Sequence, residues 1–175
     1  MVMVTALWLV LEPLTARAAN LSSTPSLDEL AHRYSTPNAI ARFLRQEFTF
    51  KRDVDLFGEA DHWQRPEEFV ARREGDCEDF AILARELLLR NWVKAYTLSV
   101  YGKRGYAHTV CVFVDPQGWY NVIDAGTVRY YRAISLEALA SELHPGWTAA
   151  GITEPNGTRG RFVTQLNPLR PVSRF

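Results

Sequence analysis

The hydrophobic pattern of the chain changes its period between Asn91 and Tyr96, and this change limits the folds open to it. Upstream of Asn91, apolar residues recur every three to four positions, as on the buried face of a helix. Downstream of Tyr96, apolar and polar residues alternate, as in strands with one buried face. Helices followed by strands with short connections predict an α+β fold, with N-terminal helices packed on one side of an antiparallel sheet.

Three segments carry helix start signals. Thr36 precedes Pro37, which combines a favoured N-cap residue with a proline at the first helical position. Pro66 opens a second helix with two glutamates in its first turn. The third helix is predicted from about Cys77 to Asn91, and its apolar stripe consists of Phe80, Ala81, Ala84, Leu87 and Leu88.

Strand periodicity follows in four segments. They cover residues 96–101, 107–114, 119–124 and 129–134. A strong turn signal, Asp115-Pro116-Gln117-Gly118, joins the second and third of them into a hairpin. Residues 136–143 are predicted to form a short helix that starts from Ser135.

The two ends of the chain are predicted to lie outside this domain. Residues 1–18 are rich in apolar side chains and end in a small-x-small pattern, which is typical of a secretory signal. The apolar run is too short for a transmembrane span. A signal at this end predicts a periplasmic or secreted protein. If the segment is not a signal, the expected location is the cytoplasm. Residues 19–35 are interpreted as a lead-in segment and residues 144–175 as an irregular tail, which leaves one domain over 36–143.

The overall composition excludes some classes of protein. The chain carries 20 basic and 20 acidic residues, a balance that does not favour nucleic acid as a partner. Its two cysteines, Cys77 and Cys111, are too few for a disulfide framework or a cysteine-rich zinc site.

Cys77 lies in the motif Gly75-Asp76-Cys77-Glu78-Asp79-Phe80-Ala81, where the third helix begins. One interpretation is structural: Asp76 is a good N-cap, Asp79 stands three residues later, and Cys77 continues the apolar stripe. Another is catalytic, with Cys77 as a nucleophile at the positive end of a helix. The acidic neighbours Asp76, Glu78 and Asp79 oppose a thiolate unless they are neutralised or point outward into solvent.

His108 and Asp124 favour the catalytic interpretation. They lie on the two strands of the predicted hairpin, and pairing about its turn brings them side by side near one end of the sheet. If the Cys77 helix packs its N-terminal end there, the three side chains form a triad. Cys77 would be the nucleophile, His108 the general base and acid, and Asp124 the residue that fixes the imidazole tautomer.

The chain resembles the transglutaminase-like superfamily in the order of Cys77, His108 and Asp124. It also resembles this superfamily in the segment Trp63-Gln64-Arg65-Pro66-Glu67-Glu68-Phe69, upstream of the cysteine motif. Within it, the chain is most similar to the bacterial transglutaminase-like cysteine proteinases, a group that includes adhesin-cleaving periplasmic proteases. The resemblance covers roughly residues 36–135 and implies a papain-like core and a catalytic role for the three residues. It also implies calcium binding at Asp76 and Glu78.

The expected function is therefore a thiol hydrolase, a cysteine peptidase acting on a peptide or amide bond in an envelope protein. The indole N–H of Trp63 is a candidate oxyanion donor, and its ring a candidate cleft wall. A protein or peptide substrate is the expected partner, with a membrane-bound regulator as a further candidate. Acyl transfer to an amine and non-catalytic peptide binding remain alternatives, because the residues do not distinguish water from an amine as acyl acceptor.

Overall fold

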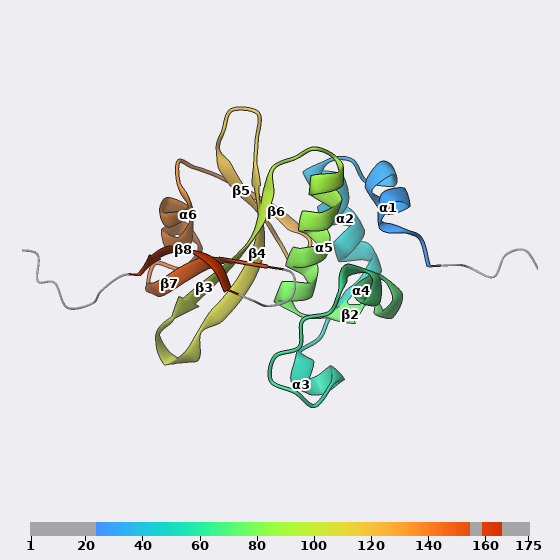
Figure 1. The fold of residues 1–175 in the computed structure, drawn as a ribbon, viewed down its shortest axis with the longest axis horizontal. Helices are drawn as coiled ribbons and strands as arrows, with labels where there is room; N and C mark the ends of the chain where they lie inside the picture. The colour runs from blue at the N-terminus through green and yellow to red at the C-terminus, as the bar shows by residue number, and fades with distance from the viewer. Residues whose placement is uncertain (1–23, 155–158, 166–175) are drawn as a thin grey trace, which may run out of the picture.

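A computed structural model describes residues 24–154 and the backbone of residues 159–165 (Figure 1). The predicted signal over residues 1–18 lies outside the described residues, as do the first five residues of the predicted lead-in. No helix within the described ranges has the length and hydrophobicity that crossing a membrane requires.

The elements follow one another in the predicted order, helices first and strands after. The helices are α1 (Leu27–Arg33), α2 (Pro37–Glu47), α3 (Asp53–Leu56), α4 (Pro66–Arg72), α5 (Cys77–Arg90), the 3-10 turn η2 (Lys103–Gly105) and α6 (Leu136–Leu143). The strands are β1 (Thr49–Phe50), β2 (Glu74–Gly75), β3 (Ala95–Gly102), β4 (Ala107–Val114), β5 (Tyr120–Asp124), β6 (Thr127–Ala133), β7 (Trp147–Thr153) and β8 (Arg159–Gln165).

The main sheet has six antiparallel strands in the order β6-β5-β4-β3-β7-β8, which confirms the predicted α+β fold. Strands β4 and β5 form the predicted hairpin, with Cys111 opposite Ile123 and Val112 opposite Val122. A separate pair of short parallel strands, β1 and β2, places the segment before Cys77 beside the segment after α2.

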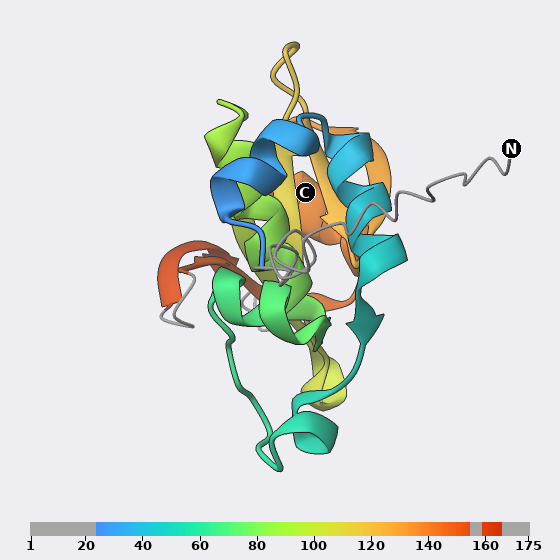
Figure 2. The same ribbon diagram turned by 90° about the vertical axis from the view of Figure 1, so that its right-hand side faces the viewer.

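Both faces of the sheet are covered, which corrects the prediction of helices on one side only. Helices α1, α2, α4 and α5 pack with Cys111, Phe113 and Ile123 on one face (Figures 1 and 2). Helix α6 covers the other face, where its buried leucines meet the valines of β3, β4 and β5. The alternation of β4 serves both cores, because successive side chains of a strand point to opposite faces.

The short helical turn expected through Leu27 and Leu30 is helix α1, which begins after Ser26. The Ser26 hydroxyl accepts the Glu29 backbone N–H at 3.2 Å, and the Glu29 carboxylate accepts the Ser26 backbone N–H at 2.8 Å. This capping box fixes the helix start. Leu27 and Leu30 are buried in the core beside α5, so the folded domain includes α1.

The predicted irregular tail is wrong, because residues 147–153 form β7 and residues 159–165 form β8. Strand β7 pairs with β3, about 50 residues earlier in the chain. Few large apolar residues mark β7, and only Trp147, Ala150 and Thr153 of it are buried. Its strand conformation depends on hydrogen bonds to a distant strand, which local periodicity does not report.

Gly75 precedes the helix that carries Cys77, and a β-carbon there would lie 2.2 Å from Asp79 Oδ2 and 2.8 Å from Gln64 Nε2. We expect Gly75→Ala to lower the free energy of unfolding by about 2 kcal/mol, because both partners are buried and cannot move apart freely. Urea denaturation measures this. Gly146→Ala is the control, since its β-carbon would meet nothing closer than 3.6 Å, and an equal loss in both variants would contradict the argument.

Candidate active site

Cys77 is the first residue of α5, at the positive end of the longest helix described. Its side chain is partly exposed rather than in the core, which corrects the expectation that it continues the apolar stripe. The buried residues are instead its acidic neighbours Glu78 and Asp79, which are 5% and 1% exposed. The helix therefore begins with a partly exposed cysteine above a buried acidic turn.

Asp79 and Gln64 hold this turn in place. The Asp79 carboxylate accepts three N–H groups: the Gln64 backbone at 3.0 Å, the Gln64 side chain at 2.7 Å and the Asp76 backbone at 3.1 Å. The last of these bonds caps the helix start, as the sequence predicts. Gln64 Nε2 also donates to the Glu74 carbonyl at 3.0 Å. The network fixes α5 against the segment that carries Trp63.

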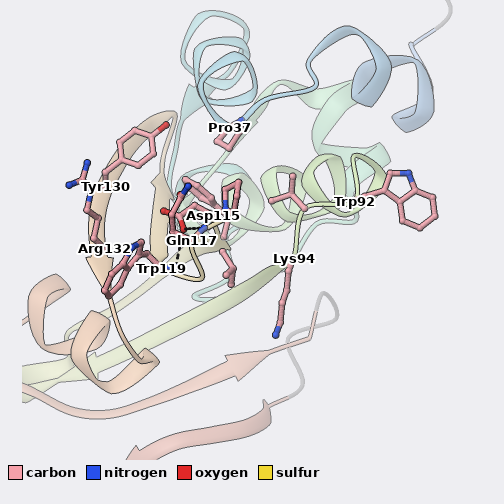
Figure 3. A pocket seen from close by; sticks show the side chains of 12 residues that line it. Pro37, Trp92, Lys94, Asp115, Gln117, Trp119, Tyr130 and Arg132 are labelled. Carbon is pink, nitrogen blue, oxygen red and sulfur yellow. Dashed lines mark hydrogen bonds between the residues drawn. The ribbon is translucent and has the colours of Figure 1, made fainter.

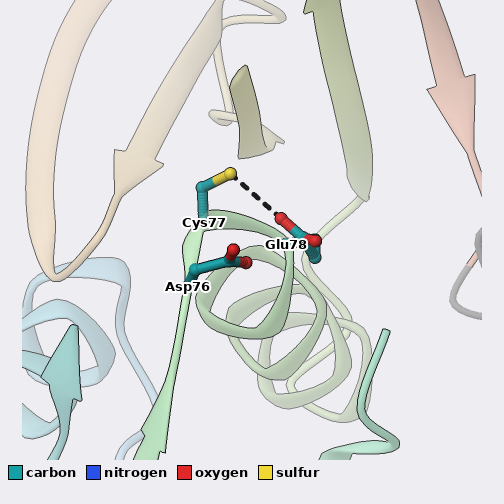
Figure 4. A group of neighbouring side chains, drawn as sticks. All are labelled: Asp76, Cys77 and Glu78. Atoms are coloured by element: carbon teal, nitrogen blue, oxygen red, sulfur yellow. Dashed lines mark hydrogen bonds between the residues drawn. The ribbon is translucent and has the colours of Figure 1, made fainter. Parts of the chain in front are cut away.

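The Cys77 thiol donates a hydrogen bond to Glu78 Oε2 at 3.0 Å (Figure 4). Burial, and then the charge of Glu78, raise the pKa of Cys77 well above its usual range. The backbone N–H of Thr109 acts in the opposite direction and favours the thiolate. Without a compensating positive charge, Glu78 keeps the sulfur protonated.

His108 and Asp124 are adjacent, as the hairpin predicts. His108 Nε2 lies 2.9 Å from Asp124 Oδ1. In the register of β4 and β5, Asp124 falls opposite Val110, so His108 is its diagonal neighbour on the same face. The hydrogen bond from His108, against the effect of burial, lowers the pKa of Asp124 below its usual value. An ionised Asp124 that accepts the Nε2 proton leaves Nδ1 of the imidazole as the basic nitrogen.

The three predicted residues are brought to the same end of α5 and β4, but they are not all in contact. The sulfur of Cys77 lies beside the backbone of Thr109, the residue after His108. Within the described residues, the hydrogen bond of the thiol goes to Glu78, and His108 pairs with Asp124. The thiol and the imidazole are thus near each other in the fold while each is bonded to a different carboxylate.

Trp63 is half-buried beside this region, and its indole N–H already has an acceptor. Nε1 donates to Asp61 Oδ1 at 3.0 Å. A donor committed to a carboxylate is not available to an oxyanion. Of the two roles expected for Trp63, the geometry favours the cleft wall over the oxyanion donor.

Asp76 and Glu78 belong to a larger group of carboxylates. Three overlapping sets of ligand atoms each lie within 4.8 Å of one another: Asp76 with Cys77 and Glu78, Asp53 with Asp61 and Glu78, and Asp53 with Asp76 and Asp79. Asp53 Oδ1 and Asp76 Oδ1 are buried and have no hydrogen-bond partner within the described part of the chain. Buried, unpaired carboxylate oxygens are unfavourable unless a cation binds them.

Sequence reasoning missed Asp53 and Asp61, which lie at the start of α3 and in the loop after it. Asp53 is 1% exposed, and its other oxygen accepts the His62 backbone N–H at 2.5 Å. The signal in the sequence is weak, because the run Asp53-Val54-Asp55 reads as an ordinary exposed turn. Asp55 does bond the exposed Arg52, and only the fold turns Asp53 inward.

The buried carboxyl groups predict an unusual dependence of stability on pH. Burial, and then the neighbouring Asp76, raise the pKa of Glu78 to about 9, and burial raises that of Asp79 to about 6. The folded state therefore retains protons that the unfolded chain has lost, and stability falls as pH rises. In a chelator, we expect the melting temperature to decrease from about pH 5 to about pH 9.

Differential scanning fluorimetry in chelator-treated buffers measures this trend. Glu78→Gln is the informative variant, since it removes the group with the highest pKa and should flatten the curve. A melting temperature that rises over the same pH interval would show that these carboxyls are not buried as described.

A model of one protein family, described as a transglutaminase-like domain, matches residues 26–132, more than half of the chain. The match begins at the cap of α1 and ends in β6, so it includes Cys77, His108 and Asp124. No curated protein matches the chain significantly.

Several solved structures are similar to the chain at low sequence identity. Calcium-bound LapG of Legionella pneumophila is 20% identical with a TM-score of 0.48, over 83% of this chain and 94% of LapG. A second LapG structure is 20% identical with a TM-score of 0.46, over 82% and 92%. A proposed cysteine protease from Cytophaga hutchinsonii is 16% identical with a TM-score of 0.47, over 59% of this chain. The chain covers 37% of that protein's length.

Proposed function

Because the chain belongs to the transglutaminase-like domain family, we propose that it is a thiol hydrolase that cleaves peptide or amide bonds with Cys77, His108 and Asp124. The observation that carries the proposal is the hydrogen bond of 2.9 Å between His108 and Asp124, beside the helix start that presents Cys77. A nucleophile, a base and a residue that orients the base are the minimum for acyl transfer through a covalent intermediate.

The proposed roles follow from the bonding of each group. Asp124 accepts the Nε2 proton of His108, so Nδ1 takes the proton of the Cys77 thiol. The thiolate attacks the carbonyl carbon of the substrate, and the resulting tetrahedral species expels the amine, which receives the proton back from His108. A thioester remains on Cys77. Water, deprotonated by His108, then attacks this thioester and releases the acid product and the free thiol.

The oxyanion of the tetrahedral species needs donors. The backbone N–H of Cys77 is the first candidate, since the first N–H groups of a helix have no partner within it. Trp63 would form a wall of the cleft, because its indole N–H is bonded to Asp61. The network of Asp79 and Gln64 would keep this wall and the helix start at a fixed separation.

A calcium ion fits the carboxylates that surround the helix start. Its ligands would come from the overlapping sets that Asp53 forms with Asp61 and Glu78 and with Asp76 and Asp79. The unpartnered oxygens of Asp53 and Asp76 are the groups such an ion would satisfy. When bound, the ion would supply positive charge beside the helix start, which favours ionised carboxylates at its ligands and the Cys77 thiolate next to them. The cleft residues Cys77, His108 and Asp124 would perform the chemistry.

The substrate would be a protein or peptide, and together with the export signal predicted for residues 1–18, the activity would act in the bacterial envelope. Partly exposed Cys77 leaves the thiol open to an extended chain from outside. A hydrolase and an amine transferase share the thioester and differ in the group that attacks it, so the test must separate the two.

We would incubate the protein with a proteome-derived peptide library in calcium and identify new amino termini by mass spectrometry. New termini made by the wild type and absent with Cys77→Ala support hydrolysis. Adding a labelled primary amine tests the alternative, since incorporation of the label without new termini indicates acyl transfer. Neither product from a protein whose Cys77 reacts with a thiol probe would refute the catalytic proposal.

A further inference from the structure

A groove of about 1030 Å³ lies at the opposite end of the domain from Cys77 (Figure 3). It is bordered by the start of α2, the residues after α5, the turn between β4 and β5, and β6. Among its lining residues are Lys94, Phe113, Pro116, Trp119, Tyr130 and Arg132. Helix α5 separates it from Cys77 by roughly 20 Å, the length of 14 residues of α-helix. The groove is thus distinct from the candidate active site.

The groove exposes large aromatic side chains. Trp119 is 38% exposed, Tyr130 54%, and Trp92 at the rim 96%. The position of Trp92 is unusual. Val93 N–H donates to the Leu88 carbonyl and Trp92 N–H to the Leu89 carbonyl, both at 3.0 Å, which is the pattern of a Schellman helix end.

In a Schellman helix end, the residue that Trp92 occupies adopts a left-handed backbone, and glycine is the favoured residue there. Trp92 has a φ of 60°, a conformation that is unfavourable for a bulky side chain. The protein therefore keeps a fully exposed tryptophan at a position where glycine would give greater stability. Backbone strain of this kind concentrates at functional sites.

The charges of the groove are unbalanced. Asp115 accepts the backbone N–H of Gln117 at 3.0 Å, that of Trp119 at 2.9 Å and the Asn121 amide at 3.0 Å. Its acceptor capacity is thus largely used. Lys94 and Arg132 are exposed and form no ion pair within the described ranges, although Lys94 Nζ lies 5.8 Å from the centre of the Tyr96 ring and Arg132 is within electrostatic reach of Asp115. Two cations therefore face one carboxylate whose acceptor capacity is largely used, and the groove carries net positive charge.

We propose that this groove binds an acidic peptide segment of a partner protein that carries a bulky apolar side chain. The apolar side chain would lie against Phe113, Pro116 and Trp119, and acidic residues on either side would pair with Lys94 and Arg132. Aromatic residues and arginine are the commonest anchors of such contacts. A sugar is less suited to the groove, because its hydroxyls need acceptors as well as donors.

Selection of random dodecapeptides displayed on phage tests the proposal, with the Cys77→Ala protein as target so that no peptide is cleaved. The double variant Lys94→Glu, Arg132→Glu serves as counter-target. We expect the selected peptides to be net acidic with at least one aromatic or large aliphatic residue. Fluorescence anisotropy of a selected peptide should show binding at least about tenfold weaker to the double variant.

Two further variants separate binding from folding. Trp92→Gly should weaken binding of the peptide. It should also raise the melting temperature of the protein, because glycine accepts the left-handed backbone. Lys103→Glu reverses an exposed charge on η2, outside the groove, and should change the affinity less than about twofold. Three outcomes would each overturn the proposal. They are a selection that yields no acidic peptides, equal peptide binding by the wild type and the double variant, and binding of the same surface to a neutral oligosaccharide array. Because the target lacks Cys77, these outcomes do not depend on the proposed hydrolase activity.

Discussion

Replacing His108 with alanine is expected to lower kcat/KM for peptide hydrolysis by about 10⁴-fold or more, and Cys77→Ala should abolish turnover. In the proposed triad, His108 takes the proton of Cys77 and returns it to the leaving amine, and its base nitrogen is set by the bond of 2.9 Å to Asp124. Asp124→Asn should lose activity by about 10²-fold or more, because an amide no longer holds the required tautomer. A fluorogenic peptide derived from the library cleavage sites gives the rates.

Cys111→Ala is the matched control for these variants. Cys111 is fully buried in the core on the helical side of the sheet, and its pKa is raised by burial. Its replacement should reduce stability slightly and leave kcat/KM per folded molecule unchanged. If His108→Ala hydrolyses the peptide as fast as the wild type while Cys77→Ala does not, the base is another residue and the proposed triad is wrong.

Saturating calcium is expected to raise the alkylation rate of Cys77 about 100-fold at neutral pH, relative to protein in chelator. The reason is the bond of 3.0 Å from the thiol to Glu78, which opposes ionisation of the sulfur. Burial and Glu78 together hold the thiol protonated, and a bound calcium ion would add positive charge beside the sulfur. A thiol pKa lower by about two units raises the thiolate fraction about 100-fold. Iodoacetamide labelling followed by mass spectrometry measures each thiol separately, with buried Cys111 as the internal reference.

Asp53→Asn tests whether the ion binds where the unpartnered oxygens lie. We expect this variant to lose most of the calcium effect, since Asp53 Oδ1 is one of the two buried oxygens without a partner in the described ranges. Asp55→Asn is the control on the same short helix, because Asp55 is exposed and bonded to Arg52. Identical labelling rates with calcium and with chelator would contradict the calcium proposal, as would equal effects of the two variants.

Local signals in the sequence located most of the elements. Thr36 and Pro37 marked the start of α2, Asp76 that of α5 and Ser135 that of α6, because capping depends on residues within one turn. The hairpin of β4 and β5 was also predictable, since its turn is short and its strands are adjacent. Strand β7 was not, because its partner β3 is separated from it in the chain by β4, β5, β6 and α6, and because it buries few large side chains.

For the candidate site, the sequence by itself determined the adjacency of His108 and Asp124. Two strands joined by a tight turn have one register, and that register fixes which residues are neighbours. The sequence also placed Cys77 at a helix start. Both results follow from contacts between residues close together in the chain.

Only the tertiary structure decided the surroundings of that cysteine. In the fold, the Cys77 thiol bonds Glu78, and the indole N–H of Trp63 bonds Asp61. Asp53 of α3 lies beside the acidic turn. The physical reason is that burial depends on segments packed from elsewhere in the chain, and burial is the largest cause of the raised pKa of Cys77. The motif identified Cys77 as the candidate nucleophile. The fold determined that the pKa of its thiol must fall before it can react.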